Sequence, residues 1–197
     1  MIQFEDIKAE IEAAGKNAIE VGGATSPLCP TALQVDKYRS LEDMYRQNGR
    51  LDAWNKFSKF LKEEEPESLE PYAASLPDGI IADAQSLPFP NETITHVITM
   101  CFPWYGPSKD IAWIERILLE YHRVLKSDGK VLILAHSNGK SDNEHKDIAE
   151  KLGFRSENIV GSFAYNKPRT FIGITKLGKK IKHQVSTEYF NGIVLTK

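Results

Sequence analysis

The chain has 197 residues, of which 41% are hydrophobic and 26% charged, and its net charge is −2. This length and composition predict one globular domain with a substantial core. The weak negative charge argues against a protein that binds nucleic acids mainly through its charge. The two cysteines, Cys29 and Cys101, are far apart and form no C-x-x-C pair, so they suggest neither a zinc site nor a disulfide framework.

The sequence contains no recognisable signal for secretion or for membrane insertion. Residues 1–16 are acidic and lack the apolar region of a signal peptide. No apolar run reaches the roughly 18 residues that a membrane span needs. We therefore expect a cytoplasmic protein without a membrane partner.

Helix and strand patterns alternate through most of the chain. In order they predict a helix at 4–15, strands at 17–21 and 32–35, a helical segment at 40–61, strands at 79–82 and 94–101, a helix at 110–125, a strand at 130–136 and a helix at 141–152. Strand-like segments follow at 159–165, 170–175 and 193–196. This alternation predicts a parallel sheet with helices on both faces, to which the last segments add antiparallel edge strands.

The connection at about 40–78 is longer than a helix crossover requires. Asn48-Gly49 is expected to divide its helical part in two, and residues 62–78 are acidic and contain three prolines. We expect one domain, 1–197, with a helical insert at about 40–78. Its aromatic residues either line a lid over the substrate or pack in a core: Trp54, Phe57 and Phe60.

The stretch AIEVGGATSP, residues 18–27, runs from a short apolar strand into two glycines. Gly22 and Gly23 can adopt backbone conformations closed to other residues and let a ligand approach the main chain. Neither a dinucleotide-binding G-x-G-x-x-G pattern nor a P-loop is present, so the loop suits a ligand with ribose and adenine but no phosphates. Asp36, after the second strand, can bind both ribose hydroxyls. A tight turn and a strand-end aspartate without a ligand are the simpler alternative.

Four segments together resemble one family, the class I S-adenosylmethionine-dependent methyltransferases. The most specific is IIADAQSLPFPNETITHVITM, residues 80–100, which is similar to the family's D-A-x-x-L-P-F segment. In the family that aspartate and the next backbone amide face the adenine, and here they are Asp83 and Ala84. LLEYHRVLKSDGKVLIL, residues 118–134, resembles the helix-turn-strand E-x-x-R-V-L-K-P-G-G, with Ser127 and Asp128 in place of Pro and Gly. AIEVGGATSP and LQVDKY resemble the first two strands, and the resemblance covers about residues 17–154.

The resemblance implies a fold and a cofactor. The fold is α/β: a Rossmann-like doubly wound, mostly parallel seven-stranded sheet with helices on both faces and an antiparallel C-terminal hairpin. The cofactor is S-adenosyl-L-methionine, and no metal is implied. The residues that would bind the cofactor are Glu20, Gly22, Gly23, Asp36, Lys37, Asp83, Ala84, Met100 and Phe102. Ala24 and Ser26 replace glycines of the family's first motif.

The catalytic residues are harder to identify, because methyl transfer from a sulfonium mostly needs alignment of the nucleophile and exclusion of water. A general base is needed only when the nucleophile carries a proton of high pKa. Tyr105 and His136 are the candidates. Tyr105 belongs to Pro103-Trp104-Tyr105, which resembles part of the motif of enzymes that methylate planar amines. Phe102 replaces that motif's polar residue, so an aromatic wall for a small or planar substrate, or simple loop packing, is favoured. His136, at the end of a strand, is either a base or a structural or solvent-facing histidine.

Two functional hypotheses follow. The first is a methyltransferase that acts on an unidentified acceptor, most simply a small molecule, while a nucleic acid or protein acceptor stays open. The basic residues at 179–183 either form a solvated loop or contact an anionic substrate or a nucleic acid. The second is an inactive methyltransferase-like module with a binding or regulatory role, which the altered glycine loop and Phe102 favour. Three acids at three strand ends, Glu20, Asp36 and Asp83, favour the first. A nicotinamide-dependent enzyme is disfavoured because the dinucleotide fingerprint is missing. The oligomeric state stays open.

Overall fold

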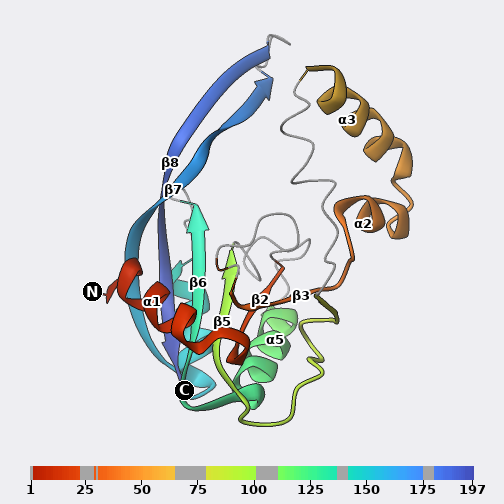
Figure 1. Cartoon of the computed structure of the whole chain (residues 1–197). Helices are drawn as coiled ribbons and strands as arrows, with labels where there is room; N and C mark the ends of the chain where they lie inside the picture. The colour runs from red at the N-terminus through yellow and green to blue at the C-terminus, as the bar shows by residue number, and fades with distance from the viewer. Residues whose placement is uncertain are drawn as a thin grey trace.

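A computed structural model of the chain describes residues 2–22, 29, 31–64, 79–100, 111–136, 142–174 and 180–197. Its centre is one eight-stranded sheet in the order β1-β7-β8-β6-β5-β2-β3-β4 (Figure 1). The strands are β1 (Ile2–Gln3), β2 (Ala18–Val21), β3 (Leu33–Asp36), β4 (Ile80–Ile81), β5 (Ile94–Met100), β6 (Leu125–His136), β7 (Arg155–Ile174) and β8 (Lys180–Thr196). The described helices are α1 (Phe4–Ala14), the short 3-10 helix η1 (Gly15–Asn17), α2 (Leu41–Gln47), α3 (Leu51–Glu64), α5 (Ile111–Val124) and α6 (Asp142–Lys151).

The sheet is doubly wound. Strands β2 to β6 are parallel, and the chain builds outward from β2 in both directions, to β3 and β4 on one side and to β5 and β6 on the other. Strand β8 is antiparallel to both β6 and β7. The predicted Rossmann-like sheet with an antiparallel C-terminal hairpin is therefore confirmed, and the two-residue β1, paired with β7, adds an eighth strand. Ligands of such sheets bind beyond the carboxyl ends of the strands, where the strand order reverses.

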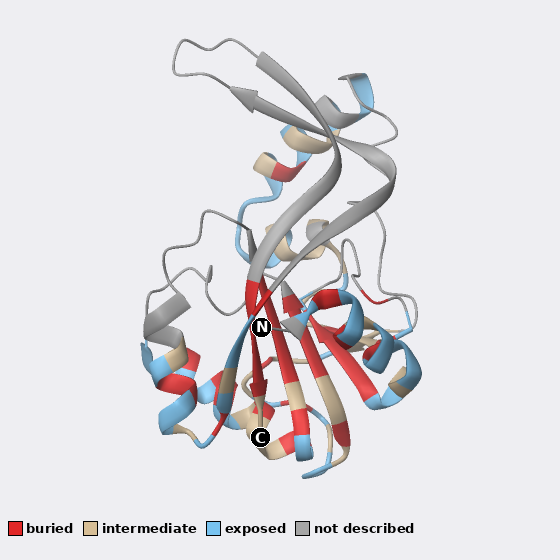
Figure 2. Cartoon of the chain, turned by 90° about the vertical axis from the view of Figure 1, so that its left-hand side faces the viewer, coloured by how far each residue is buried: buried red, intermediate tan, exposed pale blue. Residues whose placement is uncertain are grey.

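Helices cover both faces of this sheet, which explains the nearly continuous aliphatic run in β6. Val131 and Ile133 pack in one core cluster with α5 and α6, whereas Leu132 and Leu134 pack in the other cluster with α1. All four side chains are buried, as is most of the central sheet (Figure 2). Successive side chains of a strand point to opposite faces, so a strand that is buried on both faces needs no polar alternation.

Helices α2 and α3 form the described part of the insert, and residues 65–78 lie outside the described ranges. The hydroxyl of Ser40 accepts a hydrogen bond from the Asp43 N–H at 3.1 Å and so caps α2. Gly49, with φ +67°, separates the two helices as expected. Trp54 is buried, and its ring centroid lies 5.9 Å from that of Tyr45 and 6.1 Å from that of Phe57. This packing favours the core interpretation for Trp54 and Phe57, and the Phe60 side chain lies outside the description.

The C-terminal hairpin is longer than expected. Strand β8 pairs with β6 only between residues 190 and 196, and residues 180–189 lie beyond β6, where β8 pairs with β7 alone. This two-stranded ribbon and α3 extend past the same edge of the sheet (Figure 1). The segments expected at 159–165 and 170–175 belong to one strand, β7, with a register shift between Ala164 and Arg169. Pro168 lies within this shift. Proline has no N–H to donate to the ladder, which is consistent with the interrupted pairing at this point.

Candidate functional site

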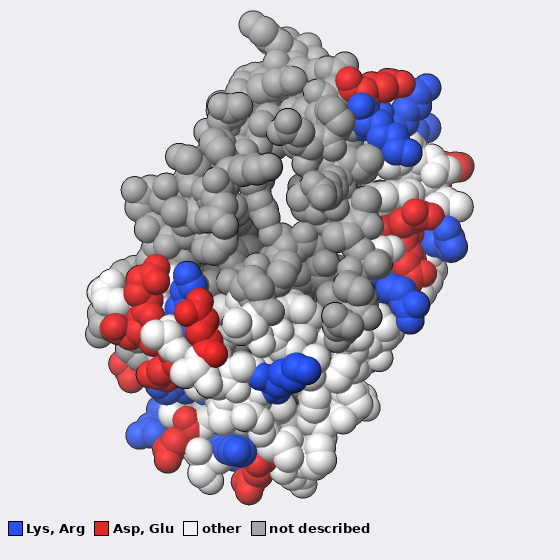
Figure 3. Space-filling view, viewed as in Figure 1, with Lys and Arg blue, Asp and Glu red and all other residues white. Residues whose placement is uncertain are grey.

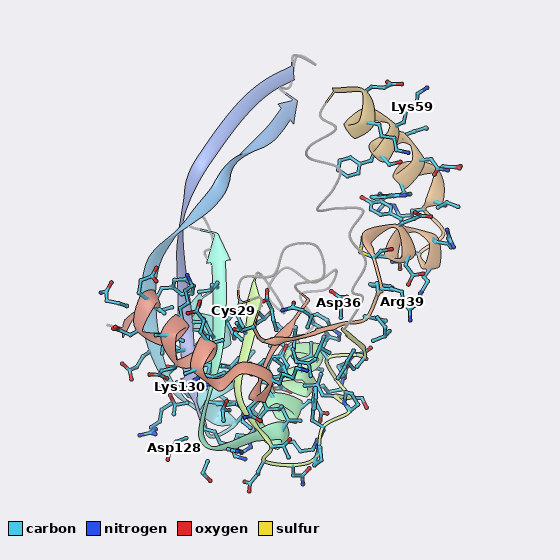
Figure 4. All side chains as sticks on the ribbon, in the orientation of Figure 1. Cys29, Asp36, Arg39, Lys59, Asp128 and Lys130 are labelled. Carbon is cyan, nitrogen blue, oxygen red and sulfur yellow. The ribbon has the colours of Figure 1, made fainter. Side chains whose placement is uncertain are left out.

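The carboxyl ends of β2, β3 and β4 meet at one edge of the sheet. The Gly22 N–H donates to the Val35 carbonyl at 2.9 Å, and the Ala82 N–H donates to the Asp36 carbonyl at 2.9 Å. These bonds place Gly22, Asp36 and the segment that begins at Asp83 next to one another. Asp36 lies below α2 and α3 in the view of Figure 4. Three of the predicted site segments are therefore brought together by main-chain pairing alone.

Glu20 lies inside this edge and fixes the loop that follows β2. Its side chain is 1% exposed, and its Oε2 accepts a hydrogen bond from the Cys29 N–H at 3.0 Å and from Gln34 Nε2 at 3.4 Å. Gln34 Nε2 also lies near the carbonyl oxygens of Cys29, at 3.4 Å, and Ala32, at 3.3 Å. Glu20 thus ties the far end of the loop to the end of β2.

The loop itself begins with a turn that requires glycine. Gly22 has φ +79°, a conformation that side-chain-bearing residues rarely adopt. The connection between β2 and β3, residues 22–32, is shorter than the dozen or more residues of a usual parallel crossover. Gly23 lies outside the described residues.

Cys29 does not supply a nucleophile. Burial raises the pKa of its thiol to about 12, and the nearby Glu20 carboxylate adds to the increase. A thiol that stays protonated at neutral pH is unreactive, because the thiolate is the nucleophilic form.

Asp36 ends β3 with a fixed carboxylate. Its Oδ1 accepts a hydrogen bond from the Tyr38 N–H at 3.0 Å. The next residue, Lys37, places its ammonium 3.6 Å from Oδ2 of Asp83, and both side chains are exposed. Lys37 therefore links the end of β3 to the start of the segment after β4.

Asp83 and Ala84 combine an acceptor and a donor on adjacent residues. Hydrogen bonding from the Gln85 N–H, at 2.9 Å, is the main cause that holds the pKa of Asp83 below its usual range, and Lys37 contributes. Asp83 is therefore ionised at neutral pH and accepts hydrogen bonds. Within the described ranges, the structure provides no acceptor for the Ala84 N–H. This pair fits the edge of adenine, which offers an amino donor next to a ring-nitrogen acceptor.

The other predicted site residues are described in part or not at all. Met100 and His136 end β5 and β6, and their backbones pair with Leu134 and Phe190, but their side chains lie outside the description. Phe102 and Tyr105 also lie outside the described residues.

The described part of the chain contains no group of three or more His, Cys, Asp or Glu side chains that could hold a metal ion. None of its helices is long and apolar enough to cross a membrane.

Sequence analysis missed the contribution of Gln34 and left Glu120 and Arg123 without a role. The only signal for Gln34 was a polar residue within an otherwise apolar strand. Glu120 and Arg123 were recognised as part of a motif, but their partners are main-chain atoms 33 to 36 residues away.

Comparisons with known proteins gave one matching family model and several similar solved structures. A sequence model described as "Methyltransferase domain" matches residues 36–133. The solved structure of YcgJ from Bacillus subtilis is similar, with a TM-score of 0.52 at 11% identity, over 98% of each chain. A TehB-like S-adenosylmethionine-dependent methyltransferase from Corynebacterium glutamicum gives a TM-score of 0.48 at 14% identity, over 96% of this chain and 87% of that one. A search of curated protein sequences gives no match.

The family match spans β3 to β6 and contains Asp36, Asp83, Ala84 and the Glu120–Arg123 motif. YcgJ supports the fold over nearly the whole chain. The chain belongs to the class I S-adenosylmethionine-dependent methyltransferases, and S-adenosylmethionine is its cofactor.

Proposed function

We propose that the protein transfers the methyl group of S-adenosylmethionine to a small-molecule acceptor at the carboxyl edge of its sheet. The observation that carries this proposal is the joint position of Gly22, Asp36 and Asp83 at the ends of three adjacent strands. When bound, the cofactor supplies a methyl group that is already activated by its sulfonium.

Each residue has a distinct proposed task. The Asp36 carboxylate accepts hydrogen bonds from the ribose hydroxyls, and the Asp83 carboxylate and Ala84 N–H bind the adenine edge. Gly22 lets the ligand approach the main chain, while Lys37 holds Asp83 in place. We propose that Gly23, Met100 and Phe102 complete the cofactor site, and that Tyr105 and His136 face the acceptor.

The mixed charge over α2 and α3 favours a small acceptor over a nucleic acid bound at these two helices. Over α2 and α3, basic and acidic side chains lie next to one another (Figure 3). Four of them form two ion pairs: Arg46 with Glu42 at 2.6 Å and Lys59 with Glu63 at 3.8 Å. A protein that binds a nucleic acid through its phosphates needs unpaired basic residues along one face.

We further propose that residues 1–197 form one domain, with residues 40–78 as its helical insert.

Calorimetric titration of S-adenosylmethionine and S-adenosylhomocysteine tests the cofactor site. We expect micromolar binding to the wild type and at least a tenfold weaker affinity for Asp36→Ala, since hydrogen bonds to a charged group contribute about 1.5–3 kcal/mol. Asp52→Ala, which removes an exposed carboxylate in the first turn of α3, is the matched control and should bind as the wild type does. A folded wild type that binds neither ligand would refute the proposal.

A binding or regulatory module without catalysis is the second candidate, favoured by Ala24 and Ser26 in the glycine loop. Release of S-adenosylhomocysteine separates the two. We expect protein-dependent release when the small-molecule fraction of a cell extract is added. Release with the macromolecular fraction alone would show that the acceptor class is wrong. Tight cofactor binding without release in either fraction would favour the module.

A further inference from the structure

One ion pair of α5 holds the main chain of the segment that follows Asp83. Arg123 donates from Nη2 to the Leu87 carbonyl at 3.0 Å and from Nη1 to the Phe89 carbonyl at 2.8 Å. Glu120 Oε1 accepts a hydrogen bond from the Leu87 N–H at 2.6 Å. Both polar groups of the Leu87 backbone are therefore bound to side chains of the same helix.

The pair itself has a fixed geometry. Arg123 Nη2 lies 2.6 Å from Glu120 Oε1, and Arg123 Nε lies 2.8 Å from Oε2, so the two groups interact through both oxygens. The Glu120 side chain is 13% exposed. The hydrogen bond from Arg123 is the main cause that holds the pKa of Glu120 below its usual range, so the pair stays ionised at neutral pH. A bidentate arginine–carboxylate pair is more directional than one formed by lysine.

A second contact from α5 reaches the residue that orients Asp83. Arg116 Nε donates to Gln85 Oε1 at 2.8 Å. The Gln85 N–H in turn donates to Asp83 Oδ1 at 2.9 Å, and the Ser86 N–H donates to the Asp83 carbonyl at 2.9 Å. The segment is thus attached to one helix at positions 85, 87 and 89, and its first attachment point also holds the Asp83 carboxylate.

We propose that Arg123 and Glu120 are positioning residues for the recognition of adenine: they fix the main chain at Leu87 and Phe89, and thereby help to place the Asp83 carboxylate and the Ala84 N–H, a few residues earlier. The inference rests on the proposed function, in which these two groups bind the adenine edge. Hypoxanthine reverses both positions, because it presents a carbonyl where adenine has an amino group and an N–H where adenine has an acceptor. A correctly placed Asp83–Ala84 pair therefore distinguishes the two bases.

The test compares the affinities of S-adenosylhomocysteine and S-inosylhomocysteine by calorimetry. We expect the wild type to prefer the adenine ligand about tenfold or more, as expected for one lost hydrogen bond to a charged group. In Arg123→Met we expect the affinity for S-adenosylhomocysteine to fall and the ratio of the two affinities to drop below about threefold. The ratio is informative because a merely structural loss of stability does not change which base is preferred.

Two control variants exclude general effects. Arg155→Met removes another arginine that pairs with a carboxylate, that of Asp128 at 3.5 Å, on the part of the sheet away from Asp36 (Figure 4). Ile7→Val removes a buried methylene from α1 and lowers stability without touching the segment. Both controls should keep the wild-type ratio.

The possible failures are distinguishable. A wild type that does not bind or does not discriminate, or an Asp83→Ala variant that keeps the full wild-type ratio, would contradict the adenine site of the proposed function. A wild type that discriminates through Asp83 while Arg123→Met keeps the full ratio would overturn the positioning role. If Arg123→Met does not fold, Arg123→Lys replaces it: an ammonium cannot reach Glu120, Leu87 and Phe89 together, so we expect a reduced ratio, and an unchanged ratio would equally overturn the inference.

Discussion

Glu20 provides a direct test of how the loop after β2 is held. Its Oε2 is the acceptor for the Cys29 N–H at 3.0 Å, and Cys29 is fully buried. Glu20→Met preserves the length of the side chain but removes the acceptor. Water cannot reach the Cys29 N–H, so the variant leaves a buried donor without its partner.

The minimum size of the effect follows from the Cys29 N–H. Gln34 Nε2, a second donor to Glu20 among the described residues, has the Cys29 and Ala32 carbonyls nearby and is not stranded by the change. An unpaired buried donor costs about 1–3 kcal/mol. In a domain of this size, 1 kcal/mol lowers Tm by about 2–4 °C, so we expect a decrease of about 2–12 °C. Glu20→Gln, which keeps an oxygen in place, should lose less than half as much.

Urea unfolding measures the free energy, and calorimetry on the folded variants measures the affinity for S-adenosylmethionine. We expect Glu20→Met to weaken the affinity as well, because Cys29 closes the loop that begins at Gly22. Glu63→Met is the matched control: its carboxylate is exposed and 3.8 Å from Lys59, so its loss should change stability by less than about 0.5 kcal/mol. Equal stabilities of the Glu20 and Glu63 variants would refute the reasoning.

Two further predictions concern stability. In Gly192→Ala the added Cβ would lie 2.3 Å from the Ile133 carbonyl oxygen, a main-chain atom of β6, so β8 must shift. We expect the free energy of unfolding, measured in urea, to fall by about 1–3 kcal/mol or more. A decrease below about 0.5 kcal/mol would contradict this close packing. Burial lowers the pKa of His96 below 6.5, with Lys130 adding to the decrease and Glu10 opposing it. The unfolded chain then binds more protons than the folded one just below pH 6.5, so stability is complete above that pH and falls as pH drops towards the lowered pKa. We therefore expect the unfolding free energy of His96→Gln to depend less steeply on pH than that of the wild type between about pH 7.5 and 5. The dependence is reduced but not abolished, because burial also lowers the pKa of His122. An unchanged slope would count against the assignment to His96.

The fold could be predicted because its main signals are local. The aliphatic run of β6 indicated a strand buried on both faces, and its residues do divide between the two core clusters. Glycines and polar residues at strand ends located Gly22, Asp36 and Asp83 at one edge, since the carboxyl ends of parallel strands meet there. Periodicity and strand order therefore predict the place of the site without any knowledge of side-chain contacts.

The attachments of the site could not be predicted in this way. Arg123 binds carbonyl oxygens of Leu87 and Phe89, and a main-chain carbonyl leaves no trace in the residue types of its segment. The hairpin was divided wrongly into separate strands, because residues 165–168 interrupt the alternation without ending β7. Asp128 stands where the family has glycine, and it keeps the glycine-like conformation with φ +61°, which aspartate tolerates better than most residues. The aspartate therefore weakens the match to the family's motif more than it changes the backbone conformation of the turn.

The described residues at the end of the connection between β2 and β3 are held by both packing and buried hydrogen bonds. Cys29 and Ala32 pack in the same cluster as α1, which precedes β2, so the N-terminal helix covers this face. Glu20 accepts a hydrogen bond from the Cys29 N–H, and Gln34 Nε2 lies near the Cys29 and Ala32 carbonyl oxygens. The adenine side is held in a different way, by α5, and the two attachments share no residue. The cofactor edge is thus assembled from separately anchored segments, and each anchor is a polar group whose loss is not compensated by the hydrophobic core.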